Sequence, residues 1–267
     1  MTPFDTSHID QIVESGLKAD LKIWTLGRFS LELDGTSIPD NWGRDKSLQL
    51  FQFLLVSRNR AAIHKEQIID RLWEEQGNDQ DFKVALHGIN KTLDPNKKNR
   101  KQARFIVRQG ATYKLNTDAI WLDTQAMEAL LEIGNNSING QKELAISAFQ
   151  YAVALYQGGF LPNRIYEDWT SAERERLQVL AMGGFISLAE LLLEKQANES
   201  IRLTEEALKH DPTWEEAYRI QMKAHMNNGN RPQAIKTYSR CAQILEQEFG
   251  IEPLPDTKQL LREIKRV

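Results

Sequence analysis

Cysteine is nearly absent from this sequence of 267 residues, in which Cys241 stands alone. A single cysteine cannot close a disulfide within the chain and leaves no second thiol for a thiolate metal site or a redox pair. Long apolar runs are also missing, because no stretch reaches the about 18 consecutive apolar residues of a membrane-spanning helix. The first twenty residues lack the basic start and apolar centre of a signal peptide. We therefore expect a cytoplasmic protein in a reducing compartment, with no membrane partner.

The motifs of common enzyme classes are missing as well. The five histidines never pair at positions i and i+4, and none adjoins Cys241 or a GxSxG turn. The sequence also contains no GxxxxGK[ST] loop or GxGxxG turn that would bind a phosphate or a dinucleotide. These absences predict a chain that is not an enzyme and that has no catalytic residue, metal site or cofactor.

Positive charge is concentrated in one part of the chain. The formal net charge is -3, yet basic residues are in excess over residues 22–122 and acidic residues are in excess over residues 123–267. Residues 83–114 hold nine basic residues against a single acidic one, Asp94. A dense basic region of this kind is typical of proteins that bind nucleic acid.

The first third of the chain begins with strand-like patterns. Residues 1–20 have a weak apolar pattern, which predicts a leader or linker with one or two helical turns. From Leu21 to Leu33 apolar and polar residues alternate, which predicts a strand. Asp34 and Gly35 then predict a hairpin turn, and residues 36–38 predict the short returning strand.

Three helical patterns follow, and then a second hairpin. The first helix is expected from Lys46, the second is opened by His64, and the third runs from about residue 80 to Leu93, where Asp94 and Pro95 end it. Two β-like runs at 103–108 and 112–116 flank a turn. This order predicts an α+β winged-helix domain over residues 21–118, in which the third helix enters the DNA major groove.

The remaining residues, 119–267, predict an all-α domain. Three segments align at one spacing, and the outer two repeat small or aromatic residues at it, which is typical of the paired helices of tetratricopeptide repeats; the middle segment departs most. An irregular helical bundle is the alternative interpretation. The chain as a whole is therefore expected to be mainly α, with a winged helix followed by a TPR-like helical domain. The three segments are Gly140, Ala145, Phe149 and Ala152; Lys195, Ser200, Thr204 and Ala207; and Gly229, Ala234, Tyr238 and Cys241.

The predicted third helix supplies the candidate DNA contacts. Its apolar side, which includes Phe82 and Ile89, faces the core, so a polar side faces outward. On that side His87 and Asn90 are expected to read base edges, and Lys83 and Lys91 to neutralise phosphates. An ordinary amphipathic helix with a solvated face is the alternative. Basic residues of the following loop and hairpin favour DNA binding and are expected to contact flanking phosphates: Lys97, Lys98, Arg100, Lys101, Arg104, Arg108 and Lys114.

Several stretches point to one family. Residues 21–35 read LKIWTLGRFSLELDG and residues 48–73 read LQLFQFLLVSRNRAAIHKEQIIDRLW. They resemble the OmpR-like winged helix that opens the SARP-type bacterial transcriptional activators, and ALHGINKTL at residues 85–93 resembles the recognition helix of that family. The second half is similar to the bacterial transcriptional activator domain that follows in the family. Its matching words include Ala154-Leu155-Tyr156-Gln157-Gly158, Phe160-Leu161-Pro162, Trp169, Arg174, Asp211-Pro212 and Phe249-Gly250.

The resemblance implies an activator that binds repeated sites in promoter DNA and recruits RNA polymerase. It also implies that the helical half mediates homodimerisation, further polymerase contact, or regulation by a small-molecule or protein effector. Gly88 within the third helix departs from the family and indicates either a close backbone approach or a weak or different reading of the bases. The loop offered to polymerase would comprise Glu74, Glu75, Gln76, Asn78, Asp79 and Gln80.

A second function remains open at this point. In this alternative the winged helix no longer recognises DNA bases, and the helical half binds a protein or a small molecule. The acidic excess over residues 123–267 agrees with either function.

Overall fold

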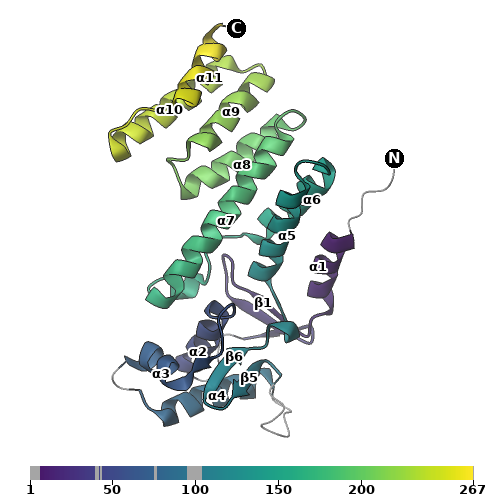
Figure 1. The fold of residues 1–267 in the computed structure, drawn as a ribbon, viewed down its shortest axis with the longest axis vertical. Helices are drawn as coiled ribbons and strands as arrows, with labels where there is room; N and C mark the ends of the chain where they lie inside the picture. The colour runs from purple at the N-terminus through teal and green to yellow at the C-terminus, as the bar shows by residue number, and fades with distance from the viewer. Residues whose placement is uncertain (1–6, 40–41, 43, 75–76, 95–103, 267) are drawn as a thin grey trace. The chain divides into compact units, whose positions relative to one another are not determined.

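The fold was analysed in a computed structural model, which describes residues 7–39, 42, 44–74, 77–94 and 104–266 (Figure 1). The chain divides into two compact units. We call residues 10–126 and 155–178 the winged-helix unit, and residues 1–9, 127–154 and 179–267 the helical unit. Within the described ranges, no helix is both long enough and apolar enough to cross a membrane.

The first described element is a helix, α1 (Ser7–Lys18), which is longer than the one or two turns expected from the sequence. Within the winged-helix unit, α1 packs closely on Trp121. An added Cβ at Gly16 would lie 2.9 Å from the indole Nε1 of Trp121. Part of the packing of this helix therefore depends on a residue about a hundred positions further along the chain.

The four-stranded sheet of the winged-helix unit has the order β3-β2-β1-β7. Strand β1 is antiparallel to β2, with Leu21 opposite Leu33, and parallel to β7. The single strand expected over residues 21–33 is therefore wrong, because the chain reverses between Trp24 and Ser30. The turn at Asp34 and Gly35 and the returning strand are confirmed. The strands are β1 (Leu21–Trp24), β2 (Ser30–Leu33), β3 (Thr36–Ile38) and β7 (Ile120–Leu122).

The reversal between β1 and β2 is held by residues far away in the sequence. Gly27 has a φ of 78° and donates its N–H to Gly159 O at 3.0 Å. Leu161 donates its N–H to Thr25 O at 2.8 Å. Thr25 is buried, so the alternation of buried and exposed positions continues into the turn and gives no local sign that the strand has ended.

The three helices and the hairpin predicted next are confirmed. His64 begins α3 by accepting the N–H of Glu66 on its Nδ1, and Asn78 begins α4 by accepting the N–H groups of Gln80 and Asp81. The second sheet has the order β4-β6-β5, and we call its β5–β6 hairpin the wing. The elements are α2 (Asp45–Val56), β4 (Ile63–His64), α3 (Lys65–Trp73), α4 (Asp79–Leu93), β5 (Ile106–Gln109), β6 (Thr112–Leu115) and the 3-10 helix η3 (Thr117–Ala119).

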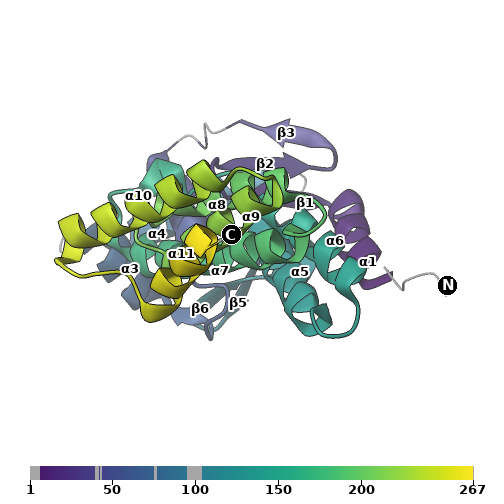
Figure 2. The same cartoon turned by 90° about the horizontal axis from the view of Figure 1, so that it is seen from above.

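The rest of the described chain is helical. In the helical unit, α9 packs against α8, α10 and α11 (Figure 2). The short helix η4 and the first turns of α7 lie in the winged-helix unit. The bounds are α5 (Asp123–Ser137), α6 (Lys142–Leu155), η4 (Pro162–Arg164), α7 (Asp168–Leu192), α8 (Ala197–His210), α9 (Glu215–Asn227), α10 (Arg231–Phe249) and α11 (Pro255–Arg266).

The repeated small residues of the second half line the contacts between these helices. Ala145, Ser200 and Ala234 occupy equivalent positions on α6, α8 and α10, and all three are fully buried. Small side chains at such positions let neighbouring helices approach closely. The prediction of a winged helix followed by a TPR-like helical domain is confirmed. Cys241 on α10 is also fully buried, and burial raises the pKa of its thiol to about 12.

Candidate nucleic-acid interface

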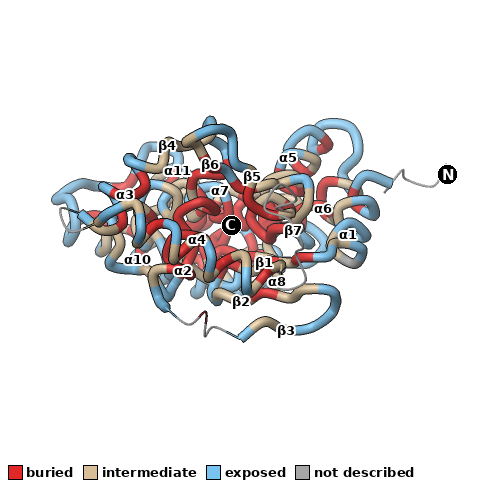
Figure 3. The backbone as a smooth tube through the Cα atoms, turned by 90° about the horizontal axis from the view of Figure 1, so that it is seen from below, coloured by how far each residue is buried: buried red, intermediate tan, exposed pale blue. Residues whose placement is uncertain are grey.

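The candidate recognition helix α4 packs against α2 and α3, and the buried stretches of α2 and α4 are red in Figure 3. Phe82 and Ile89 are buried on its inner side, as the sequence predicted. The ring of Phe82 meets the ring of Tyr113 edge-on, with 4.8 Å between their centroids. This contact packs Tyr113 of the wing against α4.

The outer side of α4 presents the predicted polar residues. Lys83, His87 and Lys91 are exposed, and Asn90 is partly buried. Asn90 donates its Nδ2 to Leu86 O, one turn earlier, at 2.9 Å. One of the two donor hydrogens of this amide is therefore already in use within the helix.

Lys83 is held by an acidic neighbour. Its Nζ lies 2.5 Å from Asp79, which also binds Lys65 at 2.5 Å. The hydrogen bonds from these two ammonium groups lower the pKa of Asp79 to about 2. An ion pair this exposed to solvent is screened by water and salt and therefore holds Lys83 only weakly.

The basic residues of the wing differ in their surroundings. Arg108 and Lys114 are exposed, and Arg108 donates its Nε to Gly110 O at 2.8 Å while its guanidinium lies 5.8 Å from the ring centre of Tyr113. Arg104 instead forms an ion pair with Asp20, and its backbone N–H binds Asp94. The wing, which carries Arg108 and Lys114, thus contacts α4 through Tyr113 and Phe82. The predicted contacts Lys97, Lys98, Arg100 and Lys101 lie outside the described residues.

The loop predicted to meet polymerase has local structural roles. Glu74 ends α3 with a φ of 55° and is exposed, as is Gln80. Asn78 caps α4, and Asp79 pairs with two lysines. Glu75 and Gln76 lie outside the described residues.

Gly88 lies where α4 crosses α2. A Cβ at Gly88 would lie 2.9 Å from the Cβ of Ser47 and closer still to its Oγ. Ser47 is itself buried. Of the two interpretations that the sequence left open, the structure therefore favours the close backbone approach.

Gly88→Ala should destabilise the chain by up to about 2 kcal/mol, because overpacking costs up to about 3 kcal/mol and the helical advantage of alanine returns roughly 1 kcal/mol. Urea unfolding measures this change. Gly140→Ala is the control, because a Cβ there meets nothing within 4 Å. Adding Ser47→Gly to Gly88→Ala should recover part of the loss, and no recovery would show that Ser47 is not the obstacle.

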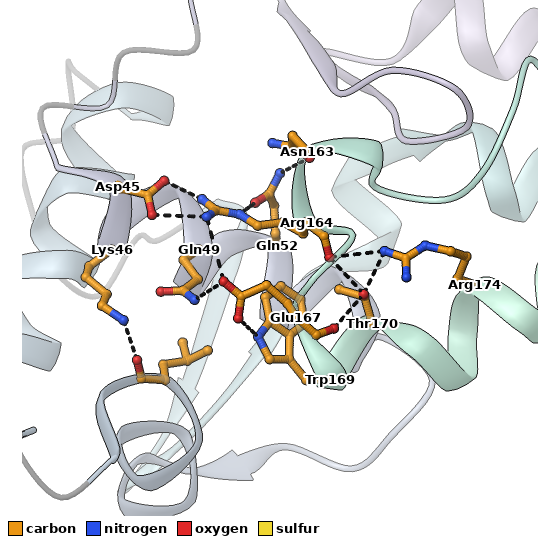
Figure 4. A network of polar contacts seen from close by, with 11 residues as sticks. Asp45, Lys46, Gln49, Gln52, Asn163, Arg164, Glu167, Trp169, Thr170 and Arg174 are labelled. Atoms are coloured by element: carbon orange, nitrogen blue, oxygen red, sulfur yellow. Dashed lines mark hydrogen bonds and ion pairs between the residues drawn. The ribbon is translucent and has the colours of Figure 1, made fainter.

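A polar network that sequence reasoning missed joins α2 to residues 160–174, all within the winged-helix unit (Figure 4). Arg164 pairs with both carboxylate oxygens of Asp45 and donates its Nε to Gln52 at 2.8 Å. Gln49 donates to Glu167 at 2.9 Å. The Arg164 guanidinium lowers the pKa of Asp45. No local pattern marks these residues, because the partners are more than a hundred positions apart.

Comparison with known families gives the relationship of the chain. The family model described as "BTAD: Bacterial transcriptional activator domain" matches residues 122–265. The chain belongs to this family. It is a transcriptional regulator of the SARP type, so the predicted family and the prediction that the chain is not an enzyme are confirmed. No curated protein matches the sequence.

A solved structure agrees with the BTAD assignment at the level of the fold. The chain is similar to Mycobacterium tuberculosis EmbR, solved in complex with a low affinity phosphopeptide, with a TM-score of 0.79 and 20% sequence identity. The match covers 93% of this chain and 66% of the EmbR chain. The similarity therefore shows a shared fold over the part of EmbR that this chain spans.

Part of the polar network lies within the residues that match the BTAD model. Arg164, Glu167 and Arg174 all fall within the matched residues, yet they pack in the same compact unit as α2. Residues 155–178 of the matched region thus belong to the same compact unit as the winged helix.

Proposed function

We propose that this SARP-type regulator binds promoter DNA through α4 and the wing and recruits RNA polymerase. The observation that carries the proposal is the outer side of α4, where Lys83, His87 and Lys91 are exposed, with Arg108 and Lys114 exposed on the wing packed beside it. An α-helix fits the major groove of B-DNA, and flanking cations gain affinity by releasing counterions from phosphates.

The exposed residues divide into two roles. His87 and Asn90 carry donors and acceptors for base edges, and an asparagine amide is suited to bidentate contact with adenine. Asn90 would exchange its bond to Leu86 O for this contact. The ammonium groups of Lys83, Lys91 and Lys114 bind phosphates as point charges.

The further parts of the proposal concern assembly. The segment from Glu74 to Gln80 is the proposed polymerase contact, and the helical domain is the proposed site of homodimerisation and of effector binding in the cytoplasm. As sequence domains, we propose a leader at residues 1–20, a winged helix at 21–118 and the BTAD at 119–267.

Lys91→Ala and Lys114→Ala test the proposal by their salt dependence. With six phosphate contacts, the logarithm of the association constant should fall with the logarithm of salt at a slope of roughly -5. Each variant should weaken binding to all DNA sequences and reduce the magnitude of this slope by about 1. Fluorescence anisotropy with labelled duplexes measures both quantities, and Lys236→Ala on the exposed side of α10 is the control.

Asn90→Ala should behave differently from the lysine variants. It should relax the preference at one base pair by about 1–3 kcal/mol and leave the salt slope unchanged. If all three variants bind like the parent chain, the proposed orientation of α4 is wrong. Failure of random and promoter DNA alike to bind at low salt, with capture of a partner by the chain, would support the alternative of an interaction module.

A further inference from the structure

We propose that residues 160–174, which lie within the BTAD, set the position of α4 through α2, so that the affinity of α4 for DNA depends on the polar network around Arg164. This inference rests on the proposed DNA binding. It assigns Arg164, Asp45 and Glu167 as positioning residues that do not themselves touch DNA.

The first step is the contact between the segment and α2. Asp45, Gln49 and Gln52 follow one another at i, i+4 and i+7, so they lie along one face of α2. Arg164 binds the first and the last of them, and Glu167 binds Gln49 (Figure 4). A paired guanidinium and carboxylate fix orientation as well as distance. The segment therefore holds α2 along two turns.

An apolar contact and a second ion pair extend this attachment toward the end of α2. The ring of Phe53 meets the ring of Trp169 edge-on, with 5.6 Å between centroids. Arg58, just beyond α2, pairs with Glu173 at 2.7 Å, and its side chain is fully buried. The segment thus follows α2 from its first residue to its end.

The second step is the contact between α2 and α4. Ser47 lies on α2 between two of the residues that the network holds, and it packs where Gly88 leaves no room for a Cβ. Closely packed interiors transmit small displacements because they contain little void to absorb them. A shift of α2 is therefore passed to the helix that carries Lys83, His87 and Lys91.

The third step is the internal rigidity of the segment. Arg174 donates to the carbonyls of Phe160 and Arg164, at 3.0 and 3.1 Å, and to the hydroxyl of Thr170 at 2.8 Å. These bonds tie η4 to the first turns of α7. The helix α7 contributes residues to both units. An effector that displaces α7 would therefore also displace residues 168–174, which are part of the same helix.

DNA binding by the full chain tests the inference. Arg164→Gln should lower affinity by about five- to tenfold, at the lower end of typical coupling between sites, with an unchanged salt slope because no phosphate contact is lost. Asp45→Asn should act in the same direction, and the double variant should bind like Arg164→Gln alone because both changes remove one ion pair. Arg202→Gln is the control, since it removes the exposed ion pair between Arg202 and Glu199 on α8.

Hydrogen exchange supplies a readout that loss of stability alone would not move. Coupling is reciprocal, so DNA should slow amide exchange over residues 160–174 in the parent chain. That protection should disappear in Arg164→Gln while protection of α4 persists. Asp45 has a largely exposed side chain, so Asp45→Asn carries the test if Arg164→Gln does not fold.

The outcomes separate the inference from the function on which it rests. If the parent chain binds DNA and both Arg164→Gln and Asp45→Asn bind it with the affinity of the parent, the coupling is overturned and DNA binding stands. The same holds if the DNA-induced protection of residues 160–174 survives both changes. A parent chain that binds no DNA would overturn both. A reduced salt slope in Arg164→Gln would assign this arginine to direct phosphate contact and overturn its positioning role.

Discussion

Gly27→Ala should destabilise the winged-helix unit by about 3 kcal/mol or more, because two costs act at the same residue. The first is the backbone conformation: Gly27 has a φ of 78°, and a left-handed conformation costs an L-residue about 1–2 kcal/mol. The second is a collision with backbone, since the added Cβ would lie 2.5 Å from the carbonyl carbon and oxygen of Gln157. Overpacking of this kind typically costs about 1–3 kcal/mol.

Gly35 provides a matched control for the two costs. Its φ is 76°, and a Cβ there meets nothing within 4 Å. Gly35→Ala should therefore show only the conformational cost, about 1–2 kcal/mol, in the same denaturant titration. If Gly27→Ala and Gly35→Ala lower the free energy of unfolding equally, the collision with the backbone of residues 157–159 adds no cost at Gly27.

Asp123→Ala should destabilise the chain by about 4 kcal/mol, because several buried donors would lose their acceptor and each costs about 1–3 kcal/mol when unsatisfied. Asp123 is 1% exposed. Its carboxylate accepts the N–H of Thr25 at 2.6 Å, the hydroxyl of Thr25 at 2.7 Å, the N–H of Leu26 at 2.9 Å and the N–H of Thr124 at 2.8 Å. This residue therefore ties the end of β1 to the start of α5.

Two further variants bracket the effect of Asp123. Asp123→Asn keeps one acceptor oxygen but places an amide donor against the donors that the second oxygen had bound, so its unfolding free energy should fall between those of the parent and Asp123→Ala. Asp118→Ala removes an exposed carboxylate nearby and should change stability by less than about 0.5 kcal/mol. A loss below about 1 kcal/mol in Asp123→Ala would mean that water or a rearranged backbone satisfies the donors.

The parts of the fold that depend on local chemistry were predictable from the sequence. His64 and Asn78 begin helices because their side chains accept backbone N–H groups two or three residues ahead, which is a signal contained within four residues. Asp34 and Gly35 both adopt positive φ, as a tight hairpin requires. The third helix and the wing followed from the same kind of information.

The remaining features depend on partners distant in the sequence. The reversal at Gly27 is imposed by residues 157–161, and the network on α2 is formed by Arg164 and Glu167. No period or spacing in either stretch indicates such a partner. The pairing of Lys83 with Asp79 is a different case, because their i, i+4 spacing on one helix is a local signal contained in the sequence.

Selection of bound fragments from sheared genomic DNA decides whether α4 and the wing read sequence. The parent chain should enrich fragments that share a repeated motif near promoters, and Lys91→Glu combined with Lys114→Glu should enrich none while retaining the thermal unfolding midpoint of the parent. Absence of enrichment by the parent at low salt, or the same motif recovered by the charge-reversed variant, would contradict DNA recognition through these elements.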